Sequence, residues 1–96
     1  MIVMGVTWED FRVRPGATYQ YVQLADWIEG HVRAGRLRPG DRLPAQRELG
    51  ELTGTSIELA GKAMALLRER GIVETSGRGS FVTDASRELP RKPGSP

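Results

Sequence analysis

Cysteine is absent from this chain of 96 residues, histidine occurs once, and no run of about 18 apolar residues exists. Without cysteine there can be no disulfide bond, no thiol nucleophile and no cysteine-ligated zinc. One histidine with scattered carboxylates does not supply the three or more ligands of a catalytic metal, and no nucleophile has a recognisable base beside it. The sequence therefore predicts no enzymatic activity, no metal and no cofactor. A cytoplasmic protein without a membrane segment is expected, since the short apolar N-terminus lacks the basic leader of a secretory signal.

Net charge is also small, because 14 Lys and Arg residues oppose 12 Asp and Glu residues to give +2. This excess lies after Asp84, where three cations, Arg87, Arg91 and Lys92, oppose one Glu. Only two of the 14 basic residues are Lys, and this bias towards Arg favours rigid, bidentate contacts with anions. The total charge alone is too small to establish binding to nucleic acid.

The chain has the length of one domain with a modest core. Residues 1–18 mix apolar and charged residues without a sustained period and contain the turn Arg14-Pro15-Gly16, so they predict an N-terminal arm. Residues 19–84 carry the periodic patterns of a folded domain. Residues 85–96 combine proline with basic residues and almost no large apolar residue, which predicts a disordered basic tail.

Three helices are indicated within residues 19–84. The first spans about residues 18–34, because one face repeats at steps of three and four: Tyr21, Leu24, Ala25, Ile28 and Val32. A Pro-Gly turn with a short extended segment follows over 37–44, and a short helix then covers about 45–53 and ends at Gly54. Ser56 is a natural N-cap for a third helix that ends at Gly71, with an apolar stripe formed by Ala60, Ala63, Met64 and Leu67.

Two β-branched or aromatic runs, 72–75 and 80–83, flank a glycine turn at 76–79 and predict a hairpin. The order helix, short strand, helix, tight turn, helix, hairpin predicts a winged helix-turn-helix, a mainly α fold with a small β-hairpin wing. Such a fold suits duplex DNA: the helix at 56–70 would enter the major groove, and the hairpin at 72–83 would contact the backbone or the minor groove. The residues facing the groove would be Ile57, Glu58, Gly61, Lys62 and Ala65.

Local charge supports this reading of the sequence. Residues 33–47 carry a net +4 directly before the predicted turn, with five arginines against Asp41, and we expect them close to the DNA backbone: Arg33, Arg36, Arg38, Arg42 and Arg47. Three acidic residues follow before Lys62: Glu48, Glu51 and Glu58. The groove-facing residues at the start of the third helix, which we call the reading edge, therefore lie in an acidic stretch of the sequence.

Several motifs in this order resemble the DNA-binding domain of the gluconate-repressor (GntR) family of bacterial transcription regulators. They are residues 35–49, Ser56, Ala63, Leu67, Gly71-Ile72-Val73 and residues 77–82, and the resemblance covers about 19–83. It implies a homodimer on palindromic double-stranded operator DNA, usually a repressor, associated with the nucleoid. It also implies that Arg47 contacts phosphate or guanine, that Ser56 supplies the capping hydroxyl, and that Gly77 and Arg78 form the wing tip.

The predicted reading residues depart from the family pattern. Ile57, Glu58 with Leu59, and Gly61 stand where the family usually has Arg, Thr-Thr and Arg. In one interpretation the protein reads a different operator: Ile57 packs on a thymine methyl, Glu58 accepts from a cytosine amino group, and Lys62 contacts phosphate or guanine. In the other, specific DNA readout has been lost and the surface contacts another regulator as an adaptor or antagonist. The local +4 favours the first.

The remaining candidates receive plainer interpretations. Family members usually add a C-terminal metabolite-binding domain, and the short tail predicts no small-molecule effector domain in this chain. Trp8 and Trp27 are expected to be packing residues, with Trp27 holding the arm against the first helix or lying at a dimer contact. His31 lies near a helix C-terminus, which mildly favours the imidazolium, and has no ligand role. Arg47 could instead pair with Glu51 one helical turn later.

Overall fold

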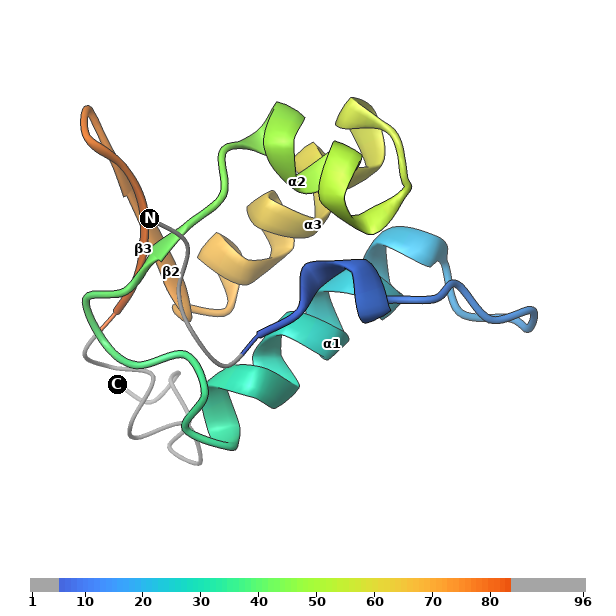
Figure 1. Ribbon diagram of the computed structural model, residues 1–96, viewed down its shortest axis with the longest axis horizontal. Helices are drawn as coiled ribbons and strands as arrows, with labels where there is room; N and C mark the ends of the chain where they lie inside the picture. The colour runs from blue at the N-terminus through green and yellow to red at the C-terminus, as the bar shows by residue number, and fades with distance from the viewer. Residues whose placement is uncertain (1–5, 84–96) are drawn as a thin grey trace.

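The computed structural model describes residues 6–83, which form three α-helices and a three-stranded antiparallel sheet (Figure 1). In chain order the elements are η1 (Trp8–Asp10), α1 (Gln20–Arg33), β1 (Arg42–Leu43), α2 (Gln46–Thr53), α3 (Ile57–Glu69), β2 (Val73–Ser76) and β3 (Gly79–Val82). The predicted winged helix-turn-helix is thus confirmed, with helix ends within two residues of those expected from the sequence. The predicted tail, residues 85–96, lies outside the described residues.

The core lies where α1 and α3 cross and where α2 packs on α3. Leu24, Ala25 and Ile28 of α1 are fully buried, as their spacing predicts. Tyr21, on the same predicted stripe, is only half-buried, because it lies at the end of α1 beside the start of α3. The apolar stripe of α3 is buried throughout, so this helix presents its other faces to solvent and to α2.

The turn between α2 and α3 follows the capping rules. Gly54 ends α2 in the left-handed conformation, with φ of 71°. Ser56 caps α3, since its hydroxyl accepts a hydrogen bond of 3.0 Å from the backbone N–H of Leu59. Gly50 brings the two helices together: a Cβ on this residue would lie 2.9 Å from the carbonyl oxygen of Ser56. The start of α3 is therefore held directly against the body of α2.

The wing is the hairpin of β2 and β3, and β1 extends it to a sheet of order β1-β3-β2. Thr75 pairs with Ser80 across the hairpin, and Leu43 of β1 pairs with Ser80 on the other side. The two-residue turn is Gly77-Arg78. Of the two glycines at the tip only Gly79 has a positive φ, 128°, so only at this position does the turn use a conformation that favours glycine.

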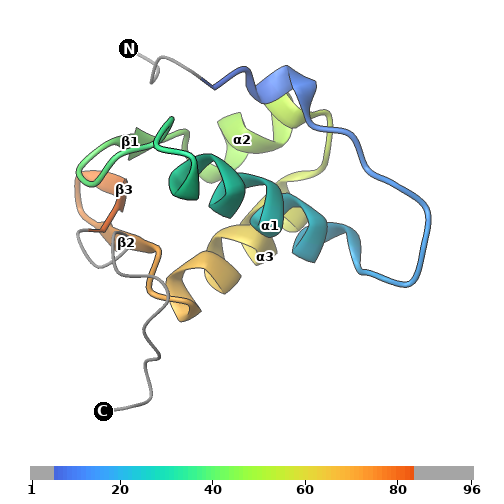
Figure 2. The same ribbon diagram turned by 90° about the horizontal axis from the view of Figure 1, so that it is seen from below.

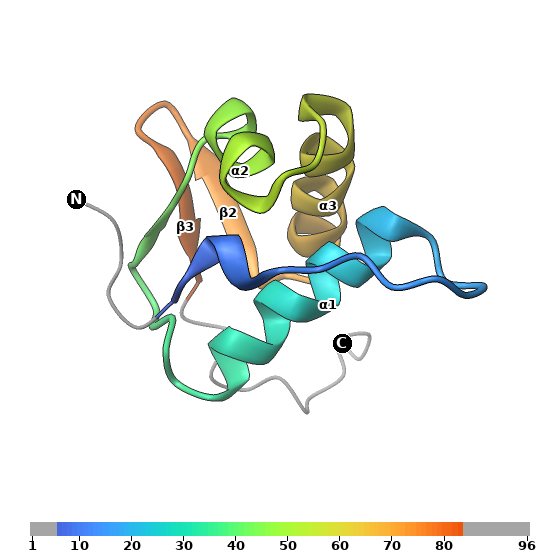
Figure 3. The same cartoon turned by 45° about the vertical axis from the view of Figure 1, so that its right-hand side comes forward.

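Residues 6–11 of the predicted arm pack onto the domain. Val6, Trp8 and Phe11 are buried with the core, and η1 contacts α2 (Figures 2 and 3). The Trp27 ring of α1 makes edge contacts with the rings of Trp8 and Phe11, at centroid distances of 6.0 and 5.5 Å. Trp27 therefore holds this segment against α1, which was one of its two predicted roles. The boundary at residue 18 stays a prediction, but residues 6–11 share the core of the domain.

Candidate nucleic-acid interface

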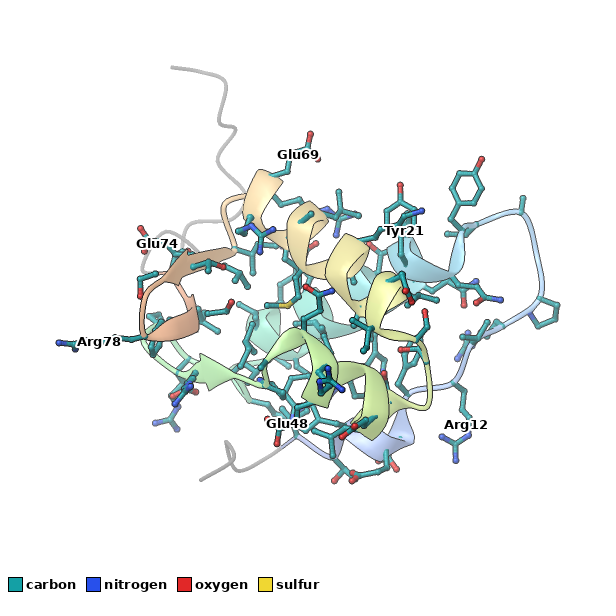
Figure 4. All side chains as sticks on the ribbon, turned by 90° about the horizontal axis from the view of Figure 1, so that it is seen from above. Arg12, Tyr21, Glu48, Glu69, Glu74 and Arg78 are labelled. Carbon is teal, nitrogen blue, oxygen red and sulfur yellow. The ribbon has the colours of Figure 1, made fainter. Side chains whose placement is uncertain are left out.

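Three elements present their ends on one face of the molecule. The N-termini of α2 and α3 and the tip of the wing all lie at the top of Figure 1, and Figure 4 looks down on this face. The N-terminus of a helix carries a partial positive charge and free N–H groups, which favour an anion. We call this surface the upper face. The eight residues that the sequence predicts as DNA-binding belong to these elements or directly precede them: Arg47, Ser56, Ile57, Glu58, Gly61, Lys62, Gly77 and Arg78.

The first turn of α3 exposes both unusual residues of the reading edge. Ile57 keeps 39% of its surface accessible, a large fraction for an isoleucine, and Glu58 is also exposed. Lys62, one turn later, is exposed as expected. The structure therefore brings an apolar, an acidic and a basic side chain together at the start of α3. These are the residue types that the sequence interpretation assigns to base and phosphate contacts.

Gly61 is the predicted reading residue whose position differs most from expectation. It is half-buried, and a Cβ at this position would lie 2.6 Å from Nε2 of Gln46. The same Nε2 donates a hydrogen bond of 3.0 Å to the carbonyl oxygen of Ile57. Gly61 thus makes room for a side chain of α2 that fastens the first turn of α3. A DNA contact by Gly61 itself stays a prediction.

Two arginines of the upper face have free guanidinium groups. Within residues 6–83, Arg47 takes part in no ion pair or side-chain hydrogen bond, so the alternative pairing with Glu51 is not found. Arg78 projects from the tip of the wing, away from the body of the domain (Figure 4). Its backbone N–H donates to the hydroxyl of Ser76, which helps to fix the turn. Both guanidinium groups are available to an external anion.

The tyrosines beside α3 were not predicted as part of this surface. Tyr19 is 72% exposed and its ring stacks on that of Tyr21, with centroids 6.0 Å apart. The Lys62 ammonium lies 5.8 Å from the centre of the Tyr21 ring, within the range of a cation–π contact. Together with Ser56, Glu58 and neighbouring residues they line an open hollow. The available sequence signal was a Tyr-x-Tyr pair at the start of the first helix.

The predicted cluster of positive charge does not converge on the upper face. Arg33 pairs with Glu29 at 2.7 Å, and Nε of Arg36 donates to Nδ1 of His31 at 2.8 Å. The segment 34–41, which also carries Arg38, lies at the lower end of Figure 1, beyond the C-terminus of α1. The five arginines therefore belong to three separate parts of the fold: the end of α1 with the segment after it, β1, and α2. Their closeness to the DNA backbone stays a prediction.

His31 also differs from expectation. Its pKa is lowered mainly by partial burial and further by the guanidinium of Arg36, while Asp10 acts in the opposite direction. The Trp27 ring contacts the imidazole edge-on at a centroid distance of 4.5 Å. These surroundings outweigh the favourable end of the helix dipole, so the folded protein favours the neutral imidazole instead of the predicted imidazolium.

The described part of the chain contains no group of three or more His, Asp or Glu side chains arranged to hold a metal ion. None of the helices within residues 6–83 is long and apolar enough to span a bilayer. What the upper face offers is a set of cations, helix N-termini and small polar groups around an exposed helix.

Comparison with known proteins identifies this arrangement. Residues 20–82 match the model of the family described as bacterial regulatory proteins, gntR family. The chain is 42% identical over 65 residues to the HTH-type transcriptional regulator GgaR of Escherichia coli strain K12, and 32% identical over 72 residues to SmoD of Agrobacterium fabrum. These matches cover 67% and 74% of this chain but only 26% and 31% of the relatives. The chain thus spans about a third or less of their length.

Solved structures show the same fold. YtrA of Sulfolobus acidocaldarius, a GntR-family transcription factor, superimposes with a TM-score of 0.73 and 29% identity over 84% of this chain and 75% of that one. The DNA-binding domain of AraR in complex with operator ORX1 superimposes with a TM-score of 0.67 and 25% identity, over 76% and 92% of the two chains. The matched family is described as regulatory proteins, in agreement with the prediction that this chain is not an enzyme. The chain belongs to the gntR family of bacterial regulatory proteins, and its described residues form a winged helix-turn-helix domain of that family.

Proposed function

We propose that this chain regulates transcription by binding operator DNA through its upper face, with α3 in the major groove and the wing in the adjacent minor groove. The observation that carries this proposal is that the N-termini of α2 and α3 and the wing tip share one face. Arg47 near the start of α2 and Arg78 at the wing tip have no ion pair within residues 6–83. The likeness to the operator-bound domain of AraR supports the same docking. Ser56 caps α3 and so fixes the start of this helix. Gly77 would let the wing tip approach the DNA backbone.

We expect the exposed residues at the start of α3 to give the protein a preference for particular bases. Ile57, exposed at the first position of α3, would pack on a thymine methyl group, and Glu58 would accept from the amino group of cytosine. Arg47 and Lys62 would contact phosphate or guanine on either side. Each well-made base contact contributes about 1–3 kcal/mol of discrimination. The operator would therefore differ from those of relatives with arginine at these positions.

We propose repression as the mode of regulation. A homodimer on a palindromic operator within a promoter would repress by covering the site that RNA polymerase requires. Each half-site would receive one copy of α3 and one wing. Regulation through the amount of protein or through a partner suits the described residues, which carry no effector domain beside the winged helix.

A titration of the full chain with duplex DNA at several salt concentrations tests the proposal. The logarithm of the affinity should fall with the logarithm of salt by about 0.9 for each phosphate contacted. Arg47→Ala should weaken binding more than removal of residues 85–96, whereas Arg33→Ala, which removes a cation already paired with Glu29, should change little. Absence of affinity at low salt would overturn the proposal. Equal losses from Arg47→Ala and from tail removal would show that only the tail binds.

The exposed Ile57 beside Glu58 supports one second candidate, a surface that binds another regulator. An apolar residue next to an acidic one is a poor partner for phosphate but suits a protein contact. Selection of sequences from a random duplex library separates the two candidates. Enrichment of a motif that changes with Ile57→Ala or Glu58→Ala supports DNA readout, and failure to enrich any motif supports the protein contact.

A further inference from the structure

A hollow of about 230 Å³ lies between the wing and the helix-turn-helix, apart from the reading edge of α3. Its walls come from β1 and the start of α2 on one side, from α3 on another, and from the wing on the third. The α2, α3 and wing segments that line it belong to the elements whose ends lie on the upper face. Arg42, which lines it, belongs to the arginines expected near the DNA backbone from the sequence, whereas Arg68, which also lines it, has no role expected from the sequence.

The lining is positively charged. It contains two arginines, Arg42 and Arg68, and no Asp or Glu. Neither arginine is in an ion pair within the part of the chain that the structure describes, whereas Arg33 and Arg70 are. Two exposed guanidinium groups beside one hollow, with no carboxylate on its walls, leave a positive potential that an anion can satisfy.

The positions of both arginines are fixed by the wing. Nη1 of Arg68 donates to the hydroxyl of Thr75 at 3.2 Å, and this hydroxyl in turn bonds that of Ser80 at 2.9 Å. The guanidinium of Arg42 lies against Gly79, where a Cβ would come within 2.9 Å of its Nε. A side chain at residue 79 would displace the guanidinium of Arg42, and glycine at this position leaves room for it. Only one of the five Arg68 donors is used by these contacts, which leaves others for a ligand.

We infer that this hollow, defined by Arg42, Arg68, Thr75 and Ser80, binds a single backbone phosphate of the DNA duplex. The inference rests on the proposed function and adds to it a contact site outside the reading edge. When α3 occupies the major groove and the wing occupies the next minor groove, the strand that separates these grooves passes between the two elements. The hollow lies between α3 and the wing, on the path of that strand. Two guanidinium groups and a hydroxyl pair provide the charge-assisted hydrogen bonds that a phosphodiester accepts.

This site would set the register of the wing relative to α3. A phosphate held by residues of β1, α3 and the wing at once bridges elements that read different grooves. Phosphate contacts of this kind position a protein without reading sequence. The site should therefore raise the affinity for every duplex by a similar factor and leave base preference unchanged.

Arg68→Gln tests the site, because it removes the charge of a surface residue whose only described side-chain bond is to Thr75. Binding to a duplex selected by the wild-type chain should weaken about tenfold, and the salt dependence should fall by about 0.9. Arg68→Lys keeps the charge and should retain most of the salt dependence with a smaller loss of affinity. Arg33→Gln removes the same charge from α1 and is the matched control, expected to change neither quantity appreciably.

Replacing one phosphate at a time by a neutral methylphosphonate locates the contact. At one position per half-site, wild type should lose about tenfold in affinity while Arg68→Gln loses nothing further. The inference is overturned when Arg68→Gln behaves like Arg33→Gln, or when no phosphate position couples to Arg68, even though wild type binds. Failure of wild type to bind any duplex at low salt is a different result, which overturns the proposed function together with this site.

Discussion

Gly50 shows how one residue controls the close packing of α2 and α3, the two helices of the proposed DNA-binding surface. A Cβ at this position would lie 2.9 Å from the Ser56 carbonyl oxygen and 3.3 Å from the backbone nitrogen of Ile57. Backbone atoms cannot move aside as a flexible side chain can, so Gly50→Ala must shift α3 relative to α2. We expect the free energy of unfolding to fall by about 1–3 kcal/mol, measured by chemical denaturation. DNA affinity should fall as well, because the start of α3 moves.

Gly30 provides the matched control for this substitution. It lies in α1 with helical geometry, is exposed, and has no heavy atom within 4 Å of the position of a Cβ. Gly30→Ala should therefore stabilise the protein by about 0.5–1 kcal/mol through the higher helix propensity of alanine. Equal effects of the two substitutions would show that contact with Ser56 does not limit the packing of α2 on α3.

His31 predicts a dependence of stability on pH. Its Nδ1 accepts a hydrogen bond from Arg36, which requires an unprotonated nitrogen, and its surroundings lower the pKa of the folded state. Between the folded and unfolded pKa values the unfolded chain binds a proton that the folded chain does not, so acid favours unfolding there. The contribution of His31 is thus fully present above its ordinary pKa of about 6.5 and is lost as pH falls below it.

Urea unfolding from about pH 7.5 to about pH 5.5 measures this effect, since most carboxylates titrate at lower pH. The free energy of unfolding of the wild-type chain should decrease across the range, and that of His31→Gln should change less. Parallel curves for the two proteins would contradict the assignment to His31.

At the scale of elements, η1 behaves as a part of the domain. Trp8 is 2% exposed and contacts Trp27 of α1, while η1 packs beside α2. Trp8→Ala should therefore lower the free energy of unfolding by about 3–5 kcal/mol, the usual result of removing a large buried aromatic side chain. Val13→Ala, in the same arm but at a residue that is 39% exposed, should change it by less than about 0.5 kcal/mol. Similar small effects of both substitutions would show that the arm does not stabilise the core.

The helices and the hairpin could be predicted because their signals are local. Apolar spacing placed α1 and α3, and Gly54 and Ser56 marked the turn between α2 and α3. Two β-branched or aromatic runs around a glycine turn marked the wing. The packing of η1 could not be predicted in the same way. Three residues in a 3₁₀ turn show no period, and Trp8 is buried only because Trp27 of a different element faces it.

The site was predicted less completely, because charge that is close in sequence need not be close in space. Arg33 is the last residue of α1 and Arg47 lies in the first turn of α2, and Arg33 is bound by Glu29 of its own helix. The reverse applies to Arg42 and Arg68, which are far apart in sequence and line one hollow. Similarly, nothing in the composition of α3 indicates that Gly61 accommodates Gln46 of α2. These features depend on tertiary packing, which a single sequence does not display.

At the scale of the whole molecule, size constrains the proposed assembly on DNA. The Cα atoms extend over 35 × 34 × 24 Å. Half-sites one helical turn apart are separated by about 34–36 Å along the duplex, so two copies on the same side of the DNA would just adjoin without overlap. A contact between them at that spacing would make binding of the second copy easier than binding of the first.

Palindromic duplexes with varied half-site spacing test this assembly. A spacing of about one turn should give the highest apparent affinity and a steep transition to a complex with two copies, measured by gel mobility shift and analytical ultracentrifugation. Five additional base pairs place the copies on opposite sides of the duplex, which removes any contact between them and should return the affinity to that of an isolated half-site. Equal affinities at all spacings would show that the copies bind independently, which contradicts the homodimer but leaves DNA binding by each domain intact.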